Sequence, residues 1–238
     1  YRVPIGGSVL KPLRSYCPHC RKEILWYDNI PLLSYLLRCG KCRHCGASIS
    51  FQYFAVELMT MLLSLGTYAY FQDIAHYLVY FCFLIAPLVA VIFIDLKHRI
   101  IPNGITLPGI LIGAMVHYWS APSMWEGKAL VDSLIGIAVG GGFLFLVAWI
   151  YEKIRKQEGM GMGDVKLAAM FGAFFGWQQV LMIIMFASVL GSVIGLLVVA
   201  IRRDWTYQLP FGPFLAVAAY LQLFLGEPIL SWYFSLMH

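Results

Sequence analysis

The chain has 238 residues, of which 61% are hydrophobic and only 12% are charged. Water-soluble proteins are about half apolar and about one quarter charged. This composition therefore excludes a soluble globular protein and predicts an all-α polytopic membrane helix bundle. The 17 Lys and Arg residues exceed the 12 Asp and Glu residues. Beyond residue 50, however, no basic stripe with interleaved aromatic residues is present, so nucleic-acid binding is not expected.

Residues 1–50 are the least hydrophobic and most basic part of the chain, and they carry two Cys-x-x-Cys pairs separated by 21 residues. This spacing is typical of a structural zinc site with four thiolates and no open coordination position. We therefore expect a small cytoplasmic zinc-binding head over 1–50 and a membrane body over 51–238. The expected ligands are Cys17, Cys20, Cys42 and Cys45.

Other roles for these cysteines are weighed against zinc. Disulfides are disfavoured in a reducing compartment, and a redox dithiol requires a βαβ context that this sequence lacks. Cys39 lies three residues before Cys42 and forms a further Cys-x-x-Cys pair with it. Gly46 follows Cys45 and suits a tight turn around a metal, which favours Cys42 with Cys45 and leaves Cys39 as a spare thiol.

Seven apolar stretches in the body predict spans, since a membrane-spanning helix needs about 20 mostly apolar residues. With the head in the cytoplasm and alternating spans, 16 of the 17 Lys and Arg residues fall on the cytoplasmic side, and Lys128 alone lies opposite. Positive residues accumulate in short cytoplasmic loops, so the distribution predicts this topology. The expected spans are 53–71, 77–95, 104–119, 129–150, 164–177, 179–201 and 210–236.

Two of the few acidic residues near the spans, Asp95 and Asp164, fall at the same cytoplasmic edge although they are 69 positions apart (164 − 95). Two facing carboxyls can share one proton and act as general base and general acid in peptide hydrolysis. Gly161 and Gly163 precede Asp164 and would let an extended substrate approach the backbone. On position alone, ion pairs of these acids with Lys97, Arg99 or Lys166 explain them equally well.

The ordered set of motifs resembles the type IV prepilin peptidases, polytopic aspartic proteases of bacterial type IV pilus and type II secretion systems. The matching segments cover nearly the whole chain. They are 14–20 (RSYCPHC), 26–31 (WYDNIP) with 33–35 (LSY), 40–45 (GKCRHC), 94–96 (IDL) with 101–103 (IPN), 161–166 (GMGDVK) and 210–216 (PFGPFLA).

The resemblance implies that Asp95 and Asp164 are the catalytic aspartates of a bifunctional enzyme of the bacterial inner membrane. Its substrates would be prepilins or pseudopilins, cleaved after a glycine at the cytoplasmic face, before a hydrophobic helix that lies in the lipid bilayer. The new N-terminus would be methylated with S-adenosylmethionine, but no methylation site is identified. The glycines at 140–142 lie in an apolar span and predict close helix packing instead.

Two departures from the family pattern are present: Cys39 is a cysteine where the family usually has none, and the family's usual first span upstream of Tyr1 is absent from this sequence. Two rival interpretations remain. One is an intramembrane protease of the presenilin type, which would place its other aspartate in the middle of a span. The other is a non-enzymatic, zinc-bearing assembly factor or thiol-redox carrier, for which the cysteines and not the aspartates would be essential.

Overall fold

The computed structural model describes residues 16–120, 126–156, 159–203 and 209–235. It divides into two compact units, Tyr1–Tyr77 and Leu78–His238, which are described separately below. Within the described residues, regular structure is helical apart from two isolated β-bridges. The prediction of an all-α chain with a small cysteine-bearing N-terminal region is therefore confirmed.

The first unit consists of the head and the first long helix. The head contains a 3-10 turn, η2 (Trp26–Asn29), and one short helix, α1 (Leu33–Leu37). Helix α2 (Phe51–Phe71) begins after Ser50, whose side chain accepts a hydrogen bond from the Gln52 backbone N–H. It ends at Gln72 in the left-handed conformation, and helix α3 (Ile74–Tyr80) then begins at the end of this unit.

The described part of the head, residues 16–50, has almost no core of its own. Among residues 16–50, only Cys17 and Gly40 are buried. A hydrophobic core of this size cannot offset the loss of chain entropy on folding. The head therefore needs a further source of stability.

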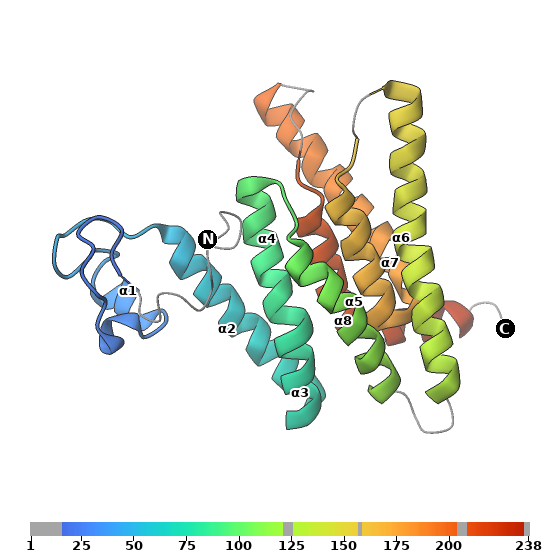
Figure 1. Cartoon of the computed structure of the whole chain (residues 1–238), viewed down its shortest axis with the longest axis horizontal. Helices are drawn as coiled ribbons and strands as arrows, with labels where there is room; N and C mark the ends of the chain where they lie inside the picture. Colours follow the sequence, from blue (N-terminus) through green and yellow to red (C-terminus); the bar gives the residue numbers. More distant parts are fainter. Residues whose placement is uncertain (1–15, 121–125, 157–158, 204–208, 236–238) are drawn as a thin grey trace. The chain divides into compact units, whose positions relative to one another are not determined.

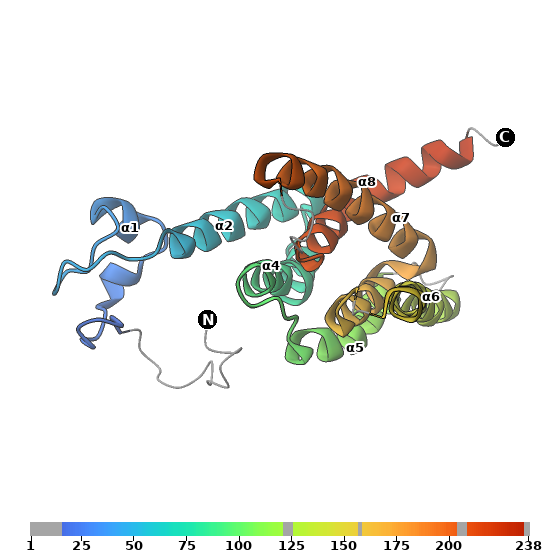
Figure 2. The same ribbon diagram turned by 90° about the horizontal axis from the view of Figure 1, so that it is seen from above.

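The second unit is a helical bundle. A π-helical turn, η3 (Phe81–Ile85), leads into α4 (Ala86–His98), and α5 (Asn103–Ser120) follows. The remaining helices are α6 (Glu126–Arg155), α7 (Met162–Arg202) and α8 (Gly212–Ser235). Figures 1 and 2 show α5 and α6 beside α7 and show that α8 changes direction along its length. Pro228 lies inside α8.

Helix α7 reverses direction at Gly176, where the backbone leaves helical geometry with φ 80° and ψ 179°. A Cβ added to Gly140 of α6 would lie 2.6 Å from Ala168 O and 2.8 Å from Val180 Cγ2. One point on α6 thus contacts residues on both sides of Gly176. Figure 1 shows the first part of α7 descending beside α6 and the second part returning. The two expected spans 164–177 and 179–201 are therefore two arms of α7, defined here as 162–175 and 177–202.

Glycines on α6 and on the first arm of α7 let the backbones of the two helices contact each other directly. A Cβ added to Gly172 would lie 2.0 Å from Gly136 O, and one added to Gly136 would lie 2.2 Å from Gly172 O. Of the glycines at 140–142, Gly140 and Gly141 pack against α7, whereas a Cβ added to Gly142 would meet no atom of another segment within 4 Å. The predicted close packing is confirmed for the first two. Such packing stabilises helix pairs in lipid, where apolar burial gives little drive.

Four helices in the described part of the chain are long and apolar enough to cross a membrane: Phe51–Phe71, Ile74–His98, Lys128–Arg155 and Met162–Arg202. Gly212–Gly226 is a shorter apolar helix. These four candidate spans agree with a multi-pass membrane protein. The count of seven spans remains a prediction, since α5 and α8 fall below this standard and both arms of α7 belong to one helix.

Candidate active site and metal centre

Asp95 lies in the last turn of α4, three residues before the helix ends at His98. The residue is only 5% exposed, although it is charged at neutral pH in water. Gly212, the first residue of α8, lies against it: an added Cβ would be 2.6 Å from Asp95 Oδ2. The end of α4 and the start of α8 therefore enclose the side chain together.

Asp164 lies in the first turn of α7 and is 9% exposed. Its backbone N–H donates to Gly161 O at 3.1 Å, and the Gly161 backbone is also close to its carboxyl, since an added Cβ would be 3.7 Å from Oδ2. Gly163 has no room for a side chain, because its Cβ would lie 2.9 Å from Ile101 Cβ. Both glycines that the sequence singles out thus border Asp164 or its neighbouring loop.

Ile101, in the loop between α4 and α5, links the surroundings of the two aspartates. It packs against Gly163 on one side, and its Cδ1 would lie 3.1 Å from a Cβ on Gly212 on the other. The Asp95 and Asp164 carboxyls are close enough to interact electrostatically. Four segments of the second unit therefore bring together two acids that are far apart in the sequence.

Each aspartate also has one carboxyl oxygen that is buried without a hydrogen-bond partner among the described residues, Oδ2 of Asp95 and Oδ1 of Asp164. Buried polar atoms without partners are rare in native proteins and often mark functional sites. Lys166, considered above as an ion-pair partner, donates instead to Asn103 Oδ1 at 2.9 Å. The unpartnered oxygens offer acceptors to a water molecule or a peptide group.

Helix α6 extends beyond the level of Asp164 toward its own C-terminus. A Cβ added to Gly141 of α6 would lie 3.7 Å from Val165 O, so Asp164 is about level with Gly141. Helix α6 continues for 14 residues beyond that level (155 − 141), a rise of about 21 Å at about 1.5 Å per residue. The aspartates therefore lie at the ends of their own helices, about 21 Å along the axis of α6 from the end of that helix.

In the first unit, the sulfur atoms of Cys17, Cys20, Cys42 and Cys45 all lie within 4.8 Å of one another. The Cys17 and Cys45 Sγ atoms are 3.8 Å apart, close to the separation of about 3.8 Å that tetrahedral geometry with Zn–S bonds of about 2.3 Å requires. The cluster could therefore hold a metal ion. Cys39 is exposed and outside this cluster.

Ionisation of the thiols also favours a cation in the cluster. Hydrogen bonds from the backbone N–H groups of Cys45 and His44 lower the pKa of Cys42 to about 6. Cys45 accepts a hydrogen bond from Ala47, which lowers its pKa, but desolvation and the neighbouring sulfurs outweigh this effect and raise the pKa to about 11. Cys45 therefore keeps its proton at neutral pH unless a cation compensates the charge of the neighbouring sulfurs, and binding of a metal ion would release that proton.

The two cysteine turns have the same backbone geometry. Arg21 N–H donates to Cys17 O at 2.9 Å, and Gly46 N–H donates to Cys42 O at 3.0 Å. These two donors occupy equivalent positions, and both have positive φ, 57° for Arg21 and 68° for Gly46. Glycine adopts this conformation without strain. The sequence signals the position in the second turn, through Gly46, but not in the first.

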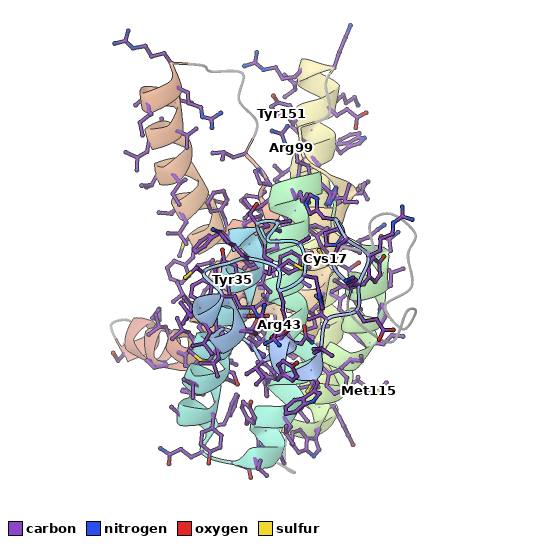
Figure 3. All side chains as sticks on the ribbon, turned by 90° about the vertical axis from the view of Figure 1, so that its left-hand side faces the viewer. Cys17, Tyr35, Arg43, Arg99, Met115 and Tyr151 are labelled. Atoms are coloured by element: carbon purple, nitrogen blue, oxygen red, sulfur yellow. The ribbon has the colours of Figure 1, made fainter. Side chains whose placement is uncertain are left out.

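An ion-pair network that sequence reasoning missed connects the two halves of the head. Asp28, in η2, accepts from Arg38 Nη2 at 2.8 Å and from Arg43 Nε at 3.1 Å. Arg43 also donates to Tyr27 Oη at 3.1 Å. Figure 3 labels Arg43 with Cys17 and Tyr35 in the head. The segment between the cysteine pairs is thus fixed to the second cysteine turn.

Other acids near the spans have structural partners. Glu57 accepts from the Leu32 backbone N–H at 2.8 Å, which ties the head to α2. Asp132 pairs with His117 Nε2 at 3.2 Å beside the Gly176 reversal, away from the two aspartates. The side chain of Glu227 lies outside the described residues.

Comparison with known proteins identifies related sequences along most of the chain. Residues 82–196 match the Type IV leader peptidase family, and residues 1–71 match the Bacterial Peptidase A24 N-terminal domain. A prepilin leader peptidase/N-methyltransferase of Stutzerimonas stutzeri is 37% identical, with 92% of this chain and 74% of the relative covered. A protein of the same name from Pseudomonas aeruginosa is 36% identical, with the same coverage. No solved structure matches the chain.

Proposed function

Because the chain belongs to the type IV prepilin leader peptidase family, we propose that it is a membrane aspartic endopeptidase with Asp95 and Asp164 as its catalytic residues. Its substrates would be prepilins or pseudopilins, cleaved after a glycine of the leader. The observation that carries the assignment of residues is the pair of buried, interacting carboxyls, each with an unpartnered oxygen.

The geometry suits hydrolysis with one shared proton. An ionised carboxylate removes a proton from a water molecule as the water attacks the scissile carbonyl carbon. The protonated partner donates a hydrogen bond to the carbonyl oxygen and afterwards protonates the leaving amine. Two acids at close range in a desolvated site favour this singly protonated state, since both cannot ionise readily.

Gly161 and Gly163 support the binding of an extended substrate segment. Glycine lets another backbone approach closely, and Gly161 has no neighbour nearer than 3.7 Å for an added Cβ. The loop before Asp164 thus leaves room beside that aspartate. The substrate's hydrophobic helix would lie in the bilayer beside the bundle, with its leader in the cytoplasm.

Orientation follows from the charge distribution. The ends of α4 and α6 and the start of α7 carry Lys97, Lys153 and Lys166. Short cytoplasmic loops retain such positive residues. We therefore place the aspartates and the cysteine head on the cytoplasmic side of the bacterial inner membrane.

The metal in the head would be structural zinc held by Cys17, Cys20, Cys42 and Cys45. Four cysteines complete its coordination and leave no position for a water molecule or substrate. The zinc would stabilise the fold of the head, and peptide hydrolysis would proceed on the aspartates alone.

N-methylation of the new N-terminus with S-adenosylmethionine is proposed from the names of the relatives. A cavity of about 500 Å³ lies between α6, the second arm of α7 and the start of α8. Among the described residues, its lining is apolar apart from Ser188 and Ser192 and includes no charged side chain for the carboxylate and ammonium groups of this cofactor. The described lining therefore gives no support for a cofactor site in this cavity, and no methyl-transfer residue is assigned.

Cleavage of a prepilin-like substrate in liposomes tests the aspartate assignment. Asp95→Asn and Asp164→Asn should each lower the rate by about 10²–10⁴-fold, the usual contribution of a general acid or base. Asp132→Asn is the matched control, because it removes a charge from the same unit while keeping an acceptor for His117. Parental cleavage by either of the first two variants, with unchanged folding, would contradict the mechanism.

A further inference from the structure

Three leucines of α1 form an exposed apolar face on the head. Leu33, Leu36 and Leu37 are 51%, 61% and 75% exposed. Their spacing of three and four positions places them on one side of the helix. Tyr35 lies between them in sequence but packs against Phe54 of α2, with ring centroids 5.2 Å apart. The leucine face therefore points away from the contact with α2.

The described residues of the head offer these leucines no interior in which to be buried, since only Cys17 and Gly40 are buried among residues 16–50. The ion pair between Arg38 and Asp28 fixes the end of α1 to η2. A rotation of α1 that turned the leucines inward would break this ion pair. Contiguous exposed apolar side chains in a folded protein mark a contact surface.

The position of α1 along α2 identifies the nature of that contact. Helix α2 has 21 residues and a length of about 31 Å at about 1.5 Å per residue, which is just the thickness of the hydrocarbon core of a bilayer, about 30 Å. The first turns of α2 must therefore lie at the membrane interface. Both the Leu32–Glu57 hydrogen bond and the Tyr35–Phe54 contact place α1 beside those turns.

The charge of the head fits an anionic surface. Residues 16–50 carry five basic residues (Arg21, Lys22, Arg38, Lys41, Arg43) and two acidic ones (Glu23, Asp28). Because a Zn²⁺ ion held by four thiolates adds a charge of −2, the net charge of the zinc-loaded head is +1. Basic residues near a membrane are attracted to anionic lipid headgroups. Exposed Trp26 adds an aromatic side chain of the type enriched at this depth.

We propose that the cysteine head is a membrane-inserted module, whose leucine face (Leu33, Leu36 and Leu37) enters the acyl-chain boundary of an anionic bilayer beside α2. The lipid surface, and not another protein, covers this face. Two interactions would then stabilise the head: coordination of the metal by the four cysteines and insertion of the leucine face into the bilayer. This role is independent of the catalytic assignment.

Site-specific photocrosslinking in the full chain tests the proposal. A benzophenone amino acid replaces Leu37 in the zinc-loaded protein, reconstituted in liposomes that contain phosphatidylglycerol. After irradiation, mass spectrometry of the peptides should find adducts of lipid acyl chains at position 37. The same replacement at Lys22, an exposed residue beside the first cysteine turn, is the matched control and should give a several-fold lower yield of acyl adducts.

Zinc content equal to that of the parent shows that each labelled protein has kept its head. Under that condition, adducts of position 37 with another segment of the protein would overturn the proposal, because the body of the chain would then cover the leucines. Equal acyl yields at positions 37 and 22 would overturn it as well, and so would the absence of any adduct at 37. Each of these results leaves the protease assignment unaffected.

Discussion

The head and the first arm of α7 each hold side chains of a proposed functional site, but they differ in how many of their residues are buried. In the head, two of the residues from 16 to 50 are buried. In the first arm of α7, every residue from Val165 to Phe175 is buried except Lys166, which is half-buried. The arm positions Asp164 by close packing on all sides, whereas the head depends on a small number of strong, specific links. A membrane protein can therefore combine a densely packed site with a region in which few of the described residues are buried.

Removal of the metal should have the largest effect and should be confined to the head. Binding of structural zinc contributes about 10–16 kcal/mol in small zinc-binding peptides, and the two buried residues among 16–50 are too few to compensate for its loss. Cys17→Ser should therefore abolish zinc binding and amide protection over 16–50, while protection over 165–175 remains. Cys39→Ser is the control, since Cys39 is outside the cluster. Loss of protection in both regions would show that the two regions fold as one.

Overpacking of the glycine contact should have the next largest effect and should be confined to the bundle. Gly172→Leu forces a side chain into a space where Cβ alone would be 2.0 Å from Gly136 O. We expect a loss of unfolding free energy above about 4 kcal/mol, the range of severe substitutions, with unchanged zinc content. Thermal unfolding in detergent measures it. Gly142→Leu is the matched control on the other helix, where an added Cβ would meet no atom of another segment within 4 Å, and it should keep the parental stability.

A smaller effect is expected at the reversal of α7. Gly176→Ala places a Cβ on a residue with φ 80° and only 1.9 Å from Asp132 Oδ2, a side-chain atom that can move. The cost should be about 1–3 kcal/mol, the usual range for backbone strain. Gly104→Ala, with open space around its Cβ, should not destabilise the protein. Equal melting temperatures for both variants would mean that the reversal tolerates a side chain.

The smallest effect is expected at Asp73, between α2 and α3. Its carboxylate accepts from the His76 backbone N–H at 3.0 Å and pairs with the His76 ring, and both interactions lower the pKa of Asp73. A lowered folded pKa stabilises the folded state above the unfolded pKa of about 3.9, and the contribution is lost as the pH falls through the folded value.

Asp73→Ala should therefore speed amide exchange at His76 near pH 6, and the difference between the variant and the parent should shrink as the pH falls below about 3.9 toward 3. Hydrogen exchange of the full chain in detergent measures both conditions, with the amides of 165–175 as an internal reference. A difference that persists unchanged at pH 3 would mean that the carboxylate does not act through its charge.

The sequence predicts those features that depend on local pattern. Apolar runs predict the helices, and the Cys-x-x-Cys spacing predicts the cluster. The juxtaposition of Asp95 with Gly212 and of Gly163 with Ile101 depends on tertiary packing, which no local pattern specifies. The positive φ of Arg21 is also absent from the pattern, because arginine carries no signal for that conformation. The sequence does not reveal the Asp28 network either, because the fold brings Arg38 and Arg43 to Asp28 from 10 and 15 positions away.

The reversal at Gly176 has a consequence for biogenesis. The first arm of α7 runs from 162 to 175, a rise of about 21 Å at about 1.5 Å per residue, which is shorter than a bilayer core of about 30 Å. By itself this arm is a poor substrate for the insertion machinery, and it carries an acid at one end. Since no loop separates it from the second arm, both must enter the bilayer together as one helical hairpin. We therefore expect Asp164 to reach its place only after residues up to about 202 have been synthesised, so that the second carboxyl of the proposed site arrives late in translation.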